Sequence, residues 1–190
     1  MHNNFIGLYP RRSALARCLN LTILTLAIAM CGFLPSLAVQ PAASRVRDAR
    51  NGFSFLPPSG WEASGLRPEP TMRFLYLGPT YKSFRANVNL IVDTDTGESF
   101  DEIARQIKEM YPGMFTGWKL AEEAPLEING KKSYYISFTH RSGGYTIKQA
   151  QFLVLGGNGK VYVVTFAAMD IAFEGLRSAI AQSALSIKIE

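Results

Sequence analysis

Apolar and polar residues alternate along the chain from position 53 onwards, which is the pattern of half-buried β-strands. The first run, Phe53–Phe55, stops at Pro57-Pro58-Ser59-Gly60, a sequence that favours a turn. Two further alternating runs cover residues 72–76 and 88–92. We therefore expect three strands in the first half of this region.

Two helices are predicted from apolar residues that recur at helical spacing. Phe100, Ile103, Ile107 and Met110 lie on one face of the first, and Pro112-Gly113 predicts its end, so we expect it over residues 100–111. The second begins near Asp170, and its apolar stripe is Phe173, Leu176 and Ile180. A last alternating strand is expected from Leu185, Ile187 and Ile189.

Four strands are predicted between the helices, over residues 120–128, 132–140, 145–155 and 160–168. Asn129-Gly130, Ser142-Gly143-Gly144 and Asn158-Gly159 separate them. Asn-Gly between apolar runs favours the primed turns of antiparallel hairpins, because both central residues need positive φ. These four strands are therefore predicted to form an antiparallel meander.

Residues 161–168 are apolar in both alternating sets, which indicates a strand that is covered on both faces. Two amphipathic helices are available as covers. The predicted fold class is α+β, a three-layer α/β/α sandwich around a central, mostly antiparallel sheet. It comprises residues 51–190 as one domain.

The first 38 residues carry the order of a secretory signal peptide: basic residues without an acid, an apolar run over 21–34, Pro35, and small residues before a cleavage site after Ala38. Residues 39–50 then read as a linker. An uncleaved anchor over residues 18–39, lipidation at Cys31 and a twin-arginine signal at Arg11-Arg12 are the alternatives. After cleavage we expect no stable membrane span, and export to a periplasm or thylakoid lumen.

The basic net charge of +5 comes from this leader and linker. Without the three leader arginines and without Arg45, Arg47, Asp48 and Arg50, residues 51–190 hold 14 basic and 14 acidic side chains. Nucleic-acid binding needs a clustered cationic surplus, so we exclude it. Both cysteines, Cys18 and Cys31, also lie in the leader, which excludes a disulfide framework and a cysteine nucleophile.

The stretch Gly52-Phe-Ser-Phe-Leu-Pro-Pro-Ser-Gly-Trp61 resembles the opening of PsbP-like domains, and the predicted order of elements over residues 51–190 is similar to theirs. The resemblance implies an extrinsic, secreted or thylakoid-lumenal protein. The best-known members of that family bind photosystem II and help it retain calcium and chloride. A nuclear import factor that binds a Ran-type GTPase shares the fold, so the resemblance implies partner binding and not catalysis.

Asp93, Asp95 and Glu98 are the candidate ligands for calcium or manganese, in a D-x-D-x-G sequence. An EF-hand loop that begins at Asp93 fails at its fifth, sixth and twelfth positions. The alternative interpretation is local structure, in which Ser99 caps the helix and Glu102 completes a capping box. We prefer this structural interpretation.

No catalytic residue is predicted. No G-x-S-x-G sequence is present. A Ser-His-Asp triad would have to use His140 as its histidine, because the other histidine, His2, leaves with the leader. His140 is better explained as a hydrogen-bonded histidine at the end of a strand. The loop Gly156-Gly-Asn-Gly-Lys160 lacks the spacing of a phosphate loop and reads as a hairpin turn.

We therefore expect an exported, non-enzymatic domain that binds a protein or a membrane-associated complex. The candidate contact surface is the proline-rich, charged segment around Leu66, Arg67 and Glu69. A metal-binding accessory protein that uses calcium or manganese is the first alternative, and a hydrolase with an unrecognised carboxylate site is the second.

Overall fold

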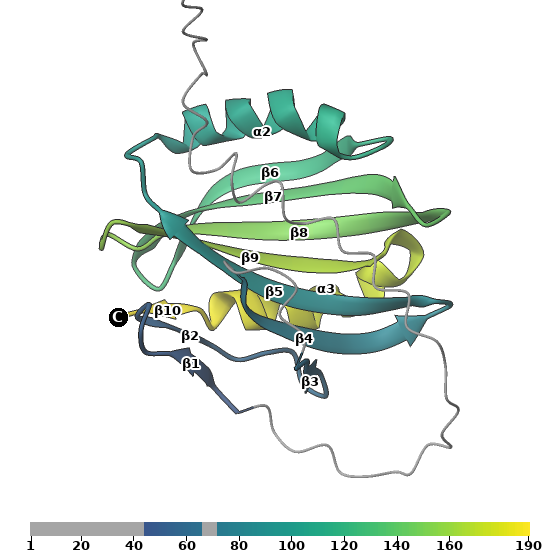
Figure 1. Ribbon diagram of the computed structural model, residues 1–190, viewed down its shortest axis with the longest axis horizontal. Coiled ribbons are helices and arrows are strands. Elements are labelled where there is room, and N and C mark those ends of the chain that lie inside the picture. The colour runs from purple at the N-terminus through teal and green to yellow at the C-terminus, as the bar shows by residue number, and fades with distance from the viewer. Residues whose placement is uncertain (1–43, 66–71) are drawn as a thin grey trace, which may run out of the picture.

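A computed structural model of the chain describes residues 44–65 and 72–190. Its main feature is a seven-stranded sheet in the order β3-β4-β5-β9-β8-β7-β6, in which every pair is antiparallel (Figure 1). The strands are β3 (Glu62–Ala63), β4 (Met72–Tyr81), β5 (Phe84–Thr94), β6 (Lys119–Ile128), β7 (Lys131–Ser142), β8 (Tyr145–Leu155) and β9 (Lys160–Met169). The helices are α2 (Phe100–Met114) and α3 (Asp170–Leu185). The predicted antiparallel sheet with two helices is thus confirmed.

A second, three-stranded sheet joins the two ends of the domain. β2 (Phe53–Phe55) lies between β1 (Val46–Asp48) and β10 (Lys188–Ile189), antiparallel to both. The sequence analysis assigned residues 39–50 to a linker, but three of them form β1. A three-residue strand is too short to show alternation, so only its pairing with β2 reveals it. The last strand is also shorter than predicted, because Leu185 ends α3.

The geometry of Gly52, in the turn before β2, explains why this position is a glycine. Its φ is +64°, and a Cβ atom there would lie 2.8 Å from the Glu190 carbonyl oxygen. The Glu190 amide donates to the Gly52 carbonyl at 2.8 Å. Any side chain at this position would push the end of the chain away from β2.

The predicted turns of the meander are confirmed at two of the three positions. Asn129 and Gly130 have φ of 48° and 77°, and Gly143 and Gly144 have φ of 55° and 81°. Positive φ at both central residues is the mark of a type I′ turn. The prediction is wrong for Asn158-Gly159: the positive φ values there fall on Gly157 and Gly159, so the chain turns through a longer loop.

β9 separates two apolar clusters. Val164 and Phe166 pack in a cluster with Phe173 and Ile180 of α3 and with the small sheet, which we call the α3-side core. Val163 belongs to a different cluster with Ile103 and Ile107 of α2, which we call the α2-side core. Adjacent side chains of a strand point to opposite faces of the sheet. Each helix therefore covers one of the two alternating sets of apolar side chains in β9.

α2 continues through Pro112 to Met114, three residues beyond the predicted end. Proline removes only one backbone hydrogen bond here, close to the end of the helix. Tyr111 and Phe115 are buried in the α2-side core, and the Phe115 amide donates to the Tyr111 carbonyl. This packing holds the last turn in place against the preference of the sequence Pro112-Gly113.

Trp61, in the segment before β3, packs against Gly78 of β4. A Cβ atom on Gly78 would lie 2.4 Å from the Trp61 indole ring, so the ring packs directly on the backbone of β4. The same ring makes an edge contact with Phe166 in the α3-side core, at 6.5 Å between centroids.

We predict that Gly78→Ala lowers the free energy of unfolding by about 1–3 kcal/mol, because the indole ring must move and leave a gap over Phe166. Urea denaturation followed by tryptophan fluorescence measures the change. Gly175→Ala is the matched control: Gly175 lies within α3 with open space around its Cα. The control should raise stability by about 0.5–1 kcal/mol. Equal effects from the two substitutions would contradict the packing of Trp61 on Gly78.

Candidate functional site

The acids around Asp93 are engaged in local hydrogen bonds. Asp93 Oδ1 accepts from the Thr94 amide at 2.7 Å, and Asp95 Oδ1 accepts from the Gly97 amide at 2.9 Å. Glu98 Oε1 accepts from Gln106 Nε2 at 2.8 Å. Among the residues that the structure describes, no three His, Cys, Asp or Glu side chains form a group that could hold a metal ion. Asp93 and Asp95 thus stabilise the backbone between β5 and α2, whereas Glu98 Oε2 is buried without a hydrogen-bond partner.

Ser99 caps α2 as predicted, since its hydroxyl accepts from the Glu102 amide at 3.2 Å. The second half of the predicted capping box is replaced by other contacts. The Glu102 carboxylate accepts from Arg105 at 2.6 Å and from Gln106 at 3.2 Å. These hydrogen bonds, led by Arg105, lower the pKa of Glu102 to about 2.

His140 is a buried, hydrogen-bonded histidine at the end of β7, as the sequence predicted. It is 8% exposed and packs against Phe115, with 4.8 Å between ring centroids. Its Nε2 lies 3.0 Å from Gln149 Nε2, and its Nδ1 lies 3.4 Å from the Arg141 carbonyl oxygen. A neutral ring with its proton on Nδ1 satisfies both contacts, because Nε2 then accepts from the Gln149 amide. Burial lowers the pKa of His140 below its ordinary value.

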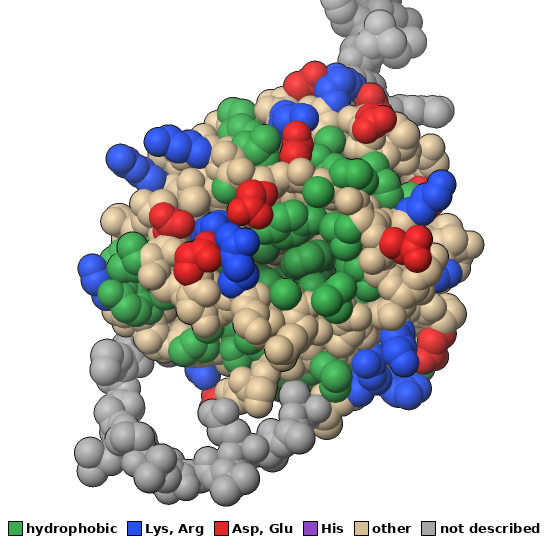
Figure 2. Space-filling view, turned by 180° about the vertical axis from the view of Figure 1, so that it is seen from behind, with side chains coloured by type: hydrophobic (Ala, Val, Ile, Leu, Met, Phe, Trp, Pro, Cys, Tyr) green, Lys and Arg blue, Asp and Glu red, His purple; other side chains and the backbone are tan. Residues whose placement is uncertain are grey.

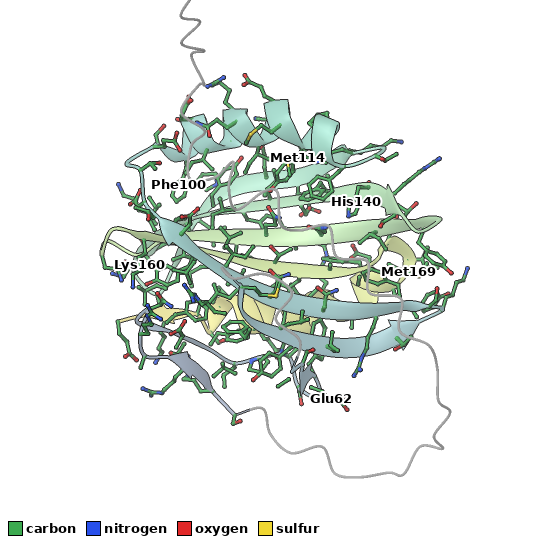
Figure 3. The ribbon with its side chains drawn as sticks, in the orientation of Figure 1. Glu62, Phe100, Met114, His140, Lys160 and Met169 are labelled. Carbon is green, nitrogen blue, oxygen red and sulfur yellow. The ribbon has the colours of Figure 1, made fainter. Side chains whose placement is uncertain are left out.

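A row of buried polar side chains crosses the sheet next to His140. Asn89, Thr165 and Gln151 lie in register on β5, β9 and β8, and Gln149 lies two residues before Gln151 on β8. Gln151 accepts from the Tyr111 hydroxyl at 2.6 Å. Asn89 Oδ1, Thr165 Oγ1 and Gln149 Oε1 are buried without a hydrogen-bond partner. The row separates the α2-side core from a smaller cluster of Ile147, Ala167 and Met169, on the side of the sheet seen in Figure 3.

The opposite side of the molecule carries partly covered apolar side chains, which we call the α3-side surface. It consists of Leu126 of β6, Tyr135 of β7, Phe152 of β8 and Leu176 of α3, all packed on the edge of the α3-side core. The rings of Tyr135 and Phe152 lie 5.1 Å apart. Figure 2 shows this face, with apolar side chains gathered around a hollow in its middle.

Charged side chains border the α3-side surface near the start of α3. Lys148 Nζ lies 3.2 Å from Glu174 Oε1, and Arg177 bridges Glu174 at 2.8 Å and Glu122 of β6 at 3.3 Å. Lys148 also lies over the Phe173 ring, 5.0 Å from its centroid. These pairs connect α3 to β6 and β8, and they mix both signs of charge along one margin of the surface.

The sequence missed the α3-side surface. Tyr135 and Phe152 were visible as aromatic residues in strands, but nothing in the alternation shows that α3 covers their face incompletely. The predicted contact segment, with Leu66, Arg67 and Glu69, lies outside the described residues, and so does the predicted cleavage site after Ala38.

The described residues thus form an α+β domain with an antiparallel seven-stranded sheet and two helices. Residues 42–189 match the PsbP family, so the chain belongs to that family. No curated protein matches the chain.

Solved structures with the same fold share little sequence with the chain. A cyanobacterial PsbP from Synechocystis is 14% identical, with a TM-score of 0.60, over 84% of this chain and 98% of that chain. LpqN from Mycobacterium tuberculosis is described as involved in cell envelope biogenesis. It is 14% identical with a TM-score of 0.59, over 77% of this chain and 89% of LpqN. The Ran-binding protein Mog1p from Saccharomyces cerevisiae is 11% identical with a TM-score of 0.50, over 77% and 95%. At these identities the likeness shows the fold.

No helix of the described residues is long and apolar enough to cross a membrane.

We predict that His140 makes the folded protein less stable as the pH falls below about 6.5, the ordinary pKa of histidine. Above that pH neither state binds the proton. Below it the unfolded chain becomes protonated while the buried ring, with its lower pKa, stays neutral, so protonation favours unfolding. Urea denaturation of the wild type and of His140→Gln between pH 7.5 and pH 5 measures the difference. A wild type and variant with identical pH dependence would contradict this prediction.

Proposed function

We propose that the chain is an exported, non-catalytic accessory domain that binds a protein or a membrane-associated complex through the α3-side surface. The observation that carries the proposal is the hollow of partly covered apolar side chains on that face, bordered by ion pairs. An apolar centre with a polar margin is typical of protein interaction sites.

The arrangement of the helices supports this location. We infer that α2, the sheet and α3 stack as three layers, because α2 and α3 pack on different apolar sets of β9. α3 then covers one face only in part, and β6 forms the open edge of the seven-stranded sheet next to the surface. A partner at this face would contact side chains from both a helix and a sheet edge.

The chemistry of the surface favours a protein partner. Tyr135 and Phe152 offer rigid apolar area with little conformational entropy to lose on binding. The charges at the margin of the surface are partly neutralised by the ion pairs of Arg177 with Glu122 and Glu174. A partner would therefore be recognised by where its charges lie and not by its net charge.

The relatives support export and partner binding as parts of the same proposal. LpqN is described as involved in cell envelope biogenesis, and Mog1p is described as a Ran-binding protein. By analogy we place this chain in a periplasm or thylakoid lumen, where the leader over residues 1–38 would direct it. Binding of Ran by Mog1p supports a binding role for this fold in our proposal.

The proposal predicts that a photoreactive amino acid in place of Leu126 cross-links the chain to one reproducible protein in the native envelope. The same amino acid in place of Glu109, an exposed residue of α2, should give no such product. Cross-linked products are separated by electrophoresis and identified by mass spectrometry. Products of equal yield from both positions would contradict the α3-side surface as the binding site.

A charged substitution tests the energetic role of the same surface. Leu176→Asp should weaken capture of the cross-linked protein by about tenfold or more, because it places a charge in the apolar centre of an interface. Ile171→Asp is the matched control, since Ile171 is 66% exposed in the first turn of α3 and lies outside the α3-side surface. Equal capture by both variants would argue against the proposal.

A further inference from the structure

A cavity of about 460 Å³ lies between the small sheet and the edge of the large sheet, apart from the α3-side surface. Residues 46–51, from β1 and the turn after it, form one wall. Residues 63–64 and 73–76, from the end of β3 and the start of β4, form the other (the region between β1 and β4 in Figure 1). The volume is in the range of cavities that hold small molecules.

Three arginines line this cavity: Arg47, Arg50 and Arg73. The acid in the lining is Asp48, and both of its carboxylate oxygens accept from Asn51, at 3.2 Å from the backbone amide and 2.6 Å from the side chain. The Asp48 carboxylate thus stabilises the turn through its hydrogen bonds with Asn51. With three arginines and one aspartate, the lining keeps a surplus of positive charge.

Arg73 gives the most direct sign of a missing ligand. Its Nε atom is buried and has no hydrogen-bond partner in the described structure. A buried N–H group of a guanidinium without an acceptor is costly, and native structures rarely keep one. An acceptor within the cavity, next to Arg73, would satisfy it.

The backbone places Arg73 there through a β-bulge. Met72 pairs with Ile91 and Phe74 pairs with Leu90, so Arg73 is the extra residue in β4. Bulges redirect a side chain out of the regular alternation and are frequent beside binding sites. A regular strand would turn residue 73 away from its present position.

Arg47 and Arg50 are held in position by the small sheet but keep their charges available. Arg47 Nη1 lies 3.5 Å from Glu190 Oε1, with both side chains more than 60% exposed, and such a pair contributes little energy. Arg50 is exposed at the turn, where Lys160 Nζ donates to the Asn51 side-chain oxygen at 3.2 Å and fixes the backbone. Arg45 next to them anchors β1 by donating to the Ser186 carbonyl at 2.9 Å.

We propose that this cavity binds a small anion that carries a phosphate group, held by Arg73 and by the exposed guanidinium groups of Arg47 and Arg50. Guanidinium groups form charge-assisted, paired hydrogen bonds with phosphate oxygens. The anion is either a soluble molecule or the headgroup of an anionic lipid. The site is independent of the proposed partner binding, since it shares no residue with the α3-side surface.

The test is a titration of the nitrogen-15-labelled protein with inorganic phosphate, at an ionic strength held constant with sodium chloride. We expect a saturable shift of the Arg73 Nε–H resonance in two-dimensional NMR spectra. Arg73→Gln should weaken phosphate binding by about tenfold or more, since it removes a charge-assisted pair of hydrogen bonds. Arg50→Gln, on an exposed side chain, should weaken it as well and serves if Arg73→Gln does not fold.

Arg105→Gln is the matched control, because it removes the same charge from α2, where Arg105 pairs with Glu102 and Glu109. It should leave phosphate binding unchanged. Phosphate that causes no saturable shift, or that binds wild type and both cavity variants equally, would overturn the proposal.

A second measurement identifies the source of the anion. Co-sedimentation with phosphatidylglycerol vesicles is compared with phosphatidylcholine vesicles. Binding to the anionic vesicles that Arg73→Gln abolishes assigns the site to a lipid headgroup. Phosphate binding without vesicle binding assigns it to a soluble anion. Vesicle binding that all variants retain, together with no phosphate binding, reflects surface adsorption and would overturn the proposal.

Discussion

The burial of β9 on both of its faces is the constraint on which the rest of the structure depends. Every residue from Val161 to Met169 is buried, so this strand must lie inside the sheet and apolar groups must cover both sides of it. α2 supplies one cover. The other comes from α3 together with β2 and β10, which are far apart in the sequence.

The small sheet is therefore part of the core and not an appendage. Phe53 stacks on Tyr162 with 5.5 Å between ring centroids, and the Tyr162 hydroxyl donates to the Asn51 carbonyl. These contacts bind the first and last segments of the domain to the central strand. They also fix the turn that carries Arg50, next to Arg47 of β1, so the same packing that completes the core builds one wall of the cavity.

Both proposed sites lie where this cover is incomplete. α3 leaves Tyr135 and Phe152 partly exposed at the side of β6 and β7. The small sheet leaves a cavity at its junction with β4. One domain thus presents two surfaces of different chemistry, one apolar and one cationic.

Local patterns in the sequence predicted most of the elements, because alternation and turn residues act over a few positions. The strand Tyr145–Leu155 and the turn at Asn129-Gly130 are examples. The errors arose where tertiary packing decides. α2 continues past Pro112 because Tyr111 and Phe115 are buried, and β1 exists only through its pairing with β2. Arg73, the key residue of the cavity, gives no signal in the sequence, since its position depends on a bulge.

The candidate sites were harder to predict than the fold for the same reason. The acids around Asp93 are prominent in the sequence, yet one oxygen each of Asp93, Asp95 and Glu98 accepts a hydrogen bond from a neighbouring amide or from Gln106. The α3-side surface combines residues from β6, β7, β8 and α3, and their proximity follows from the sheet order and not from any motif.

The central claim is that a partner binds at the α3-side surface. Hydrogen exchange of the chain in its native complex tests this claim most directly, because it locates a bound partner without any substitution. The account predicts that amides of β6, of β8 and of the middle of α3 exchange more slowly in the complex than in the free protein, while those of α2 are unchanged. Slower exchange in α2 with no change in β6 and α3 would contradict it.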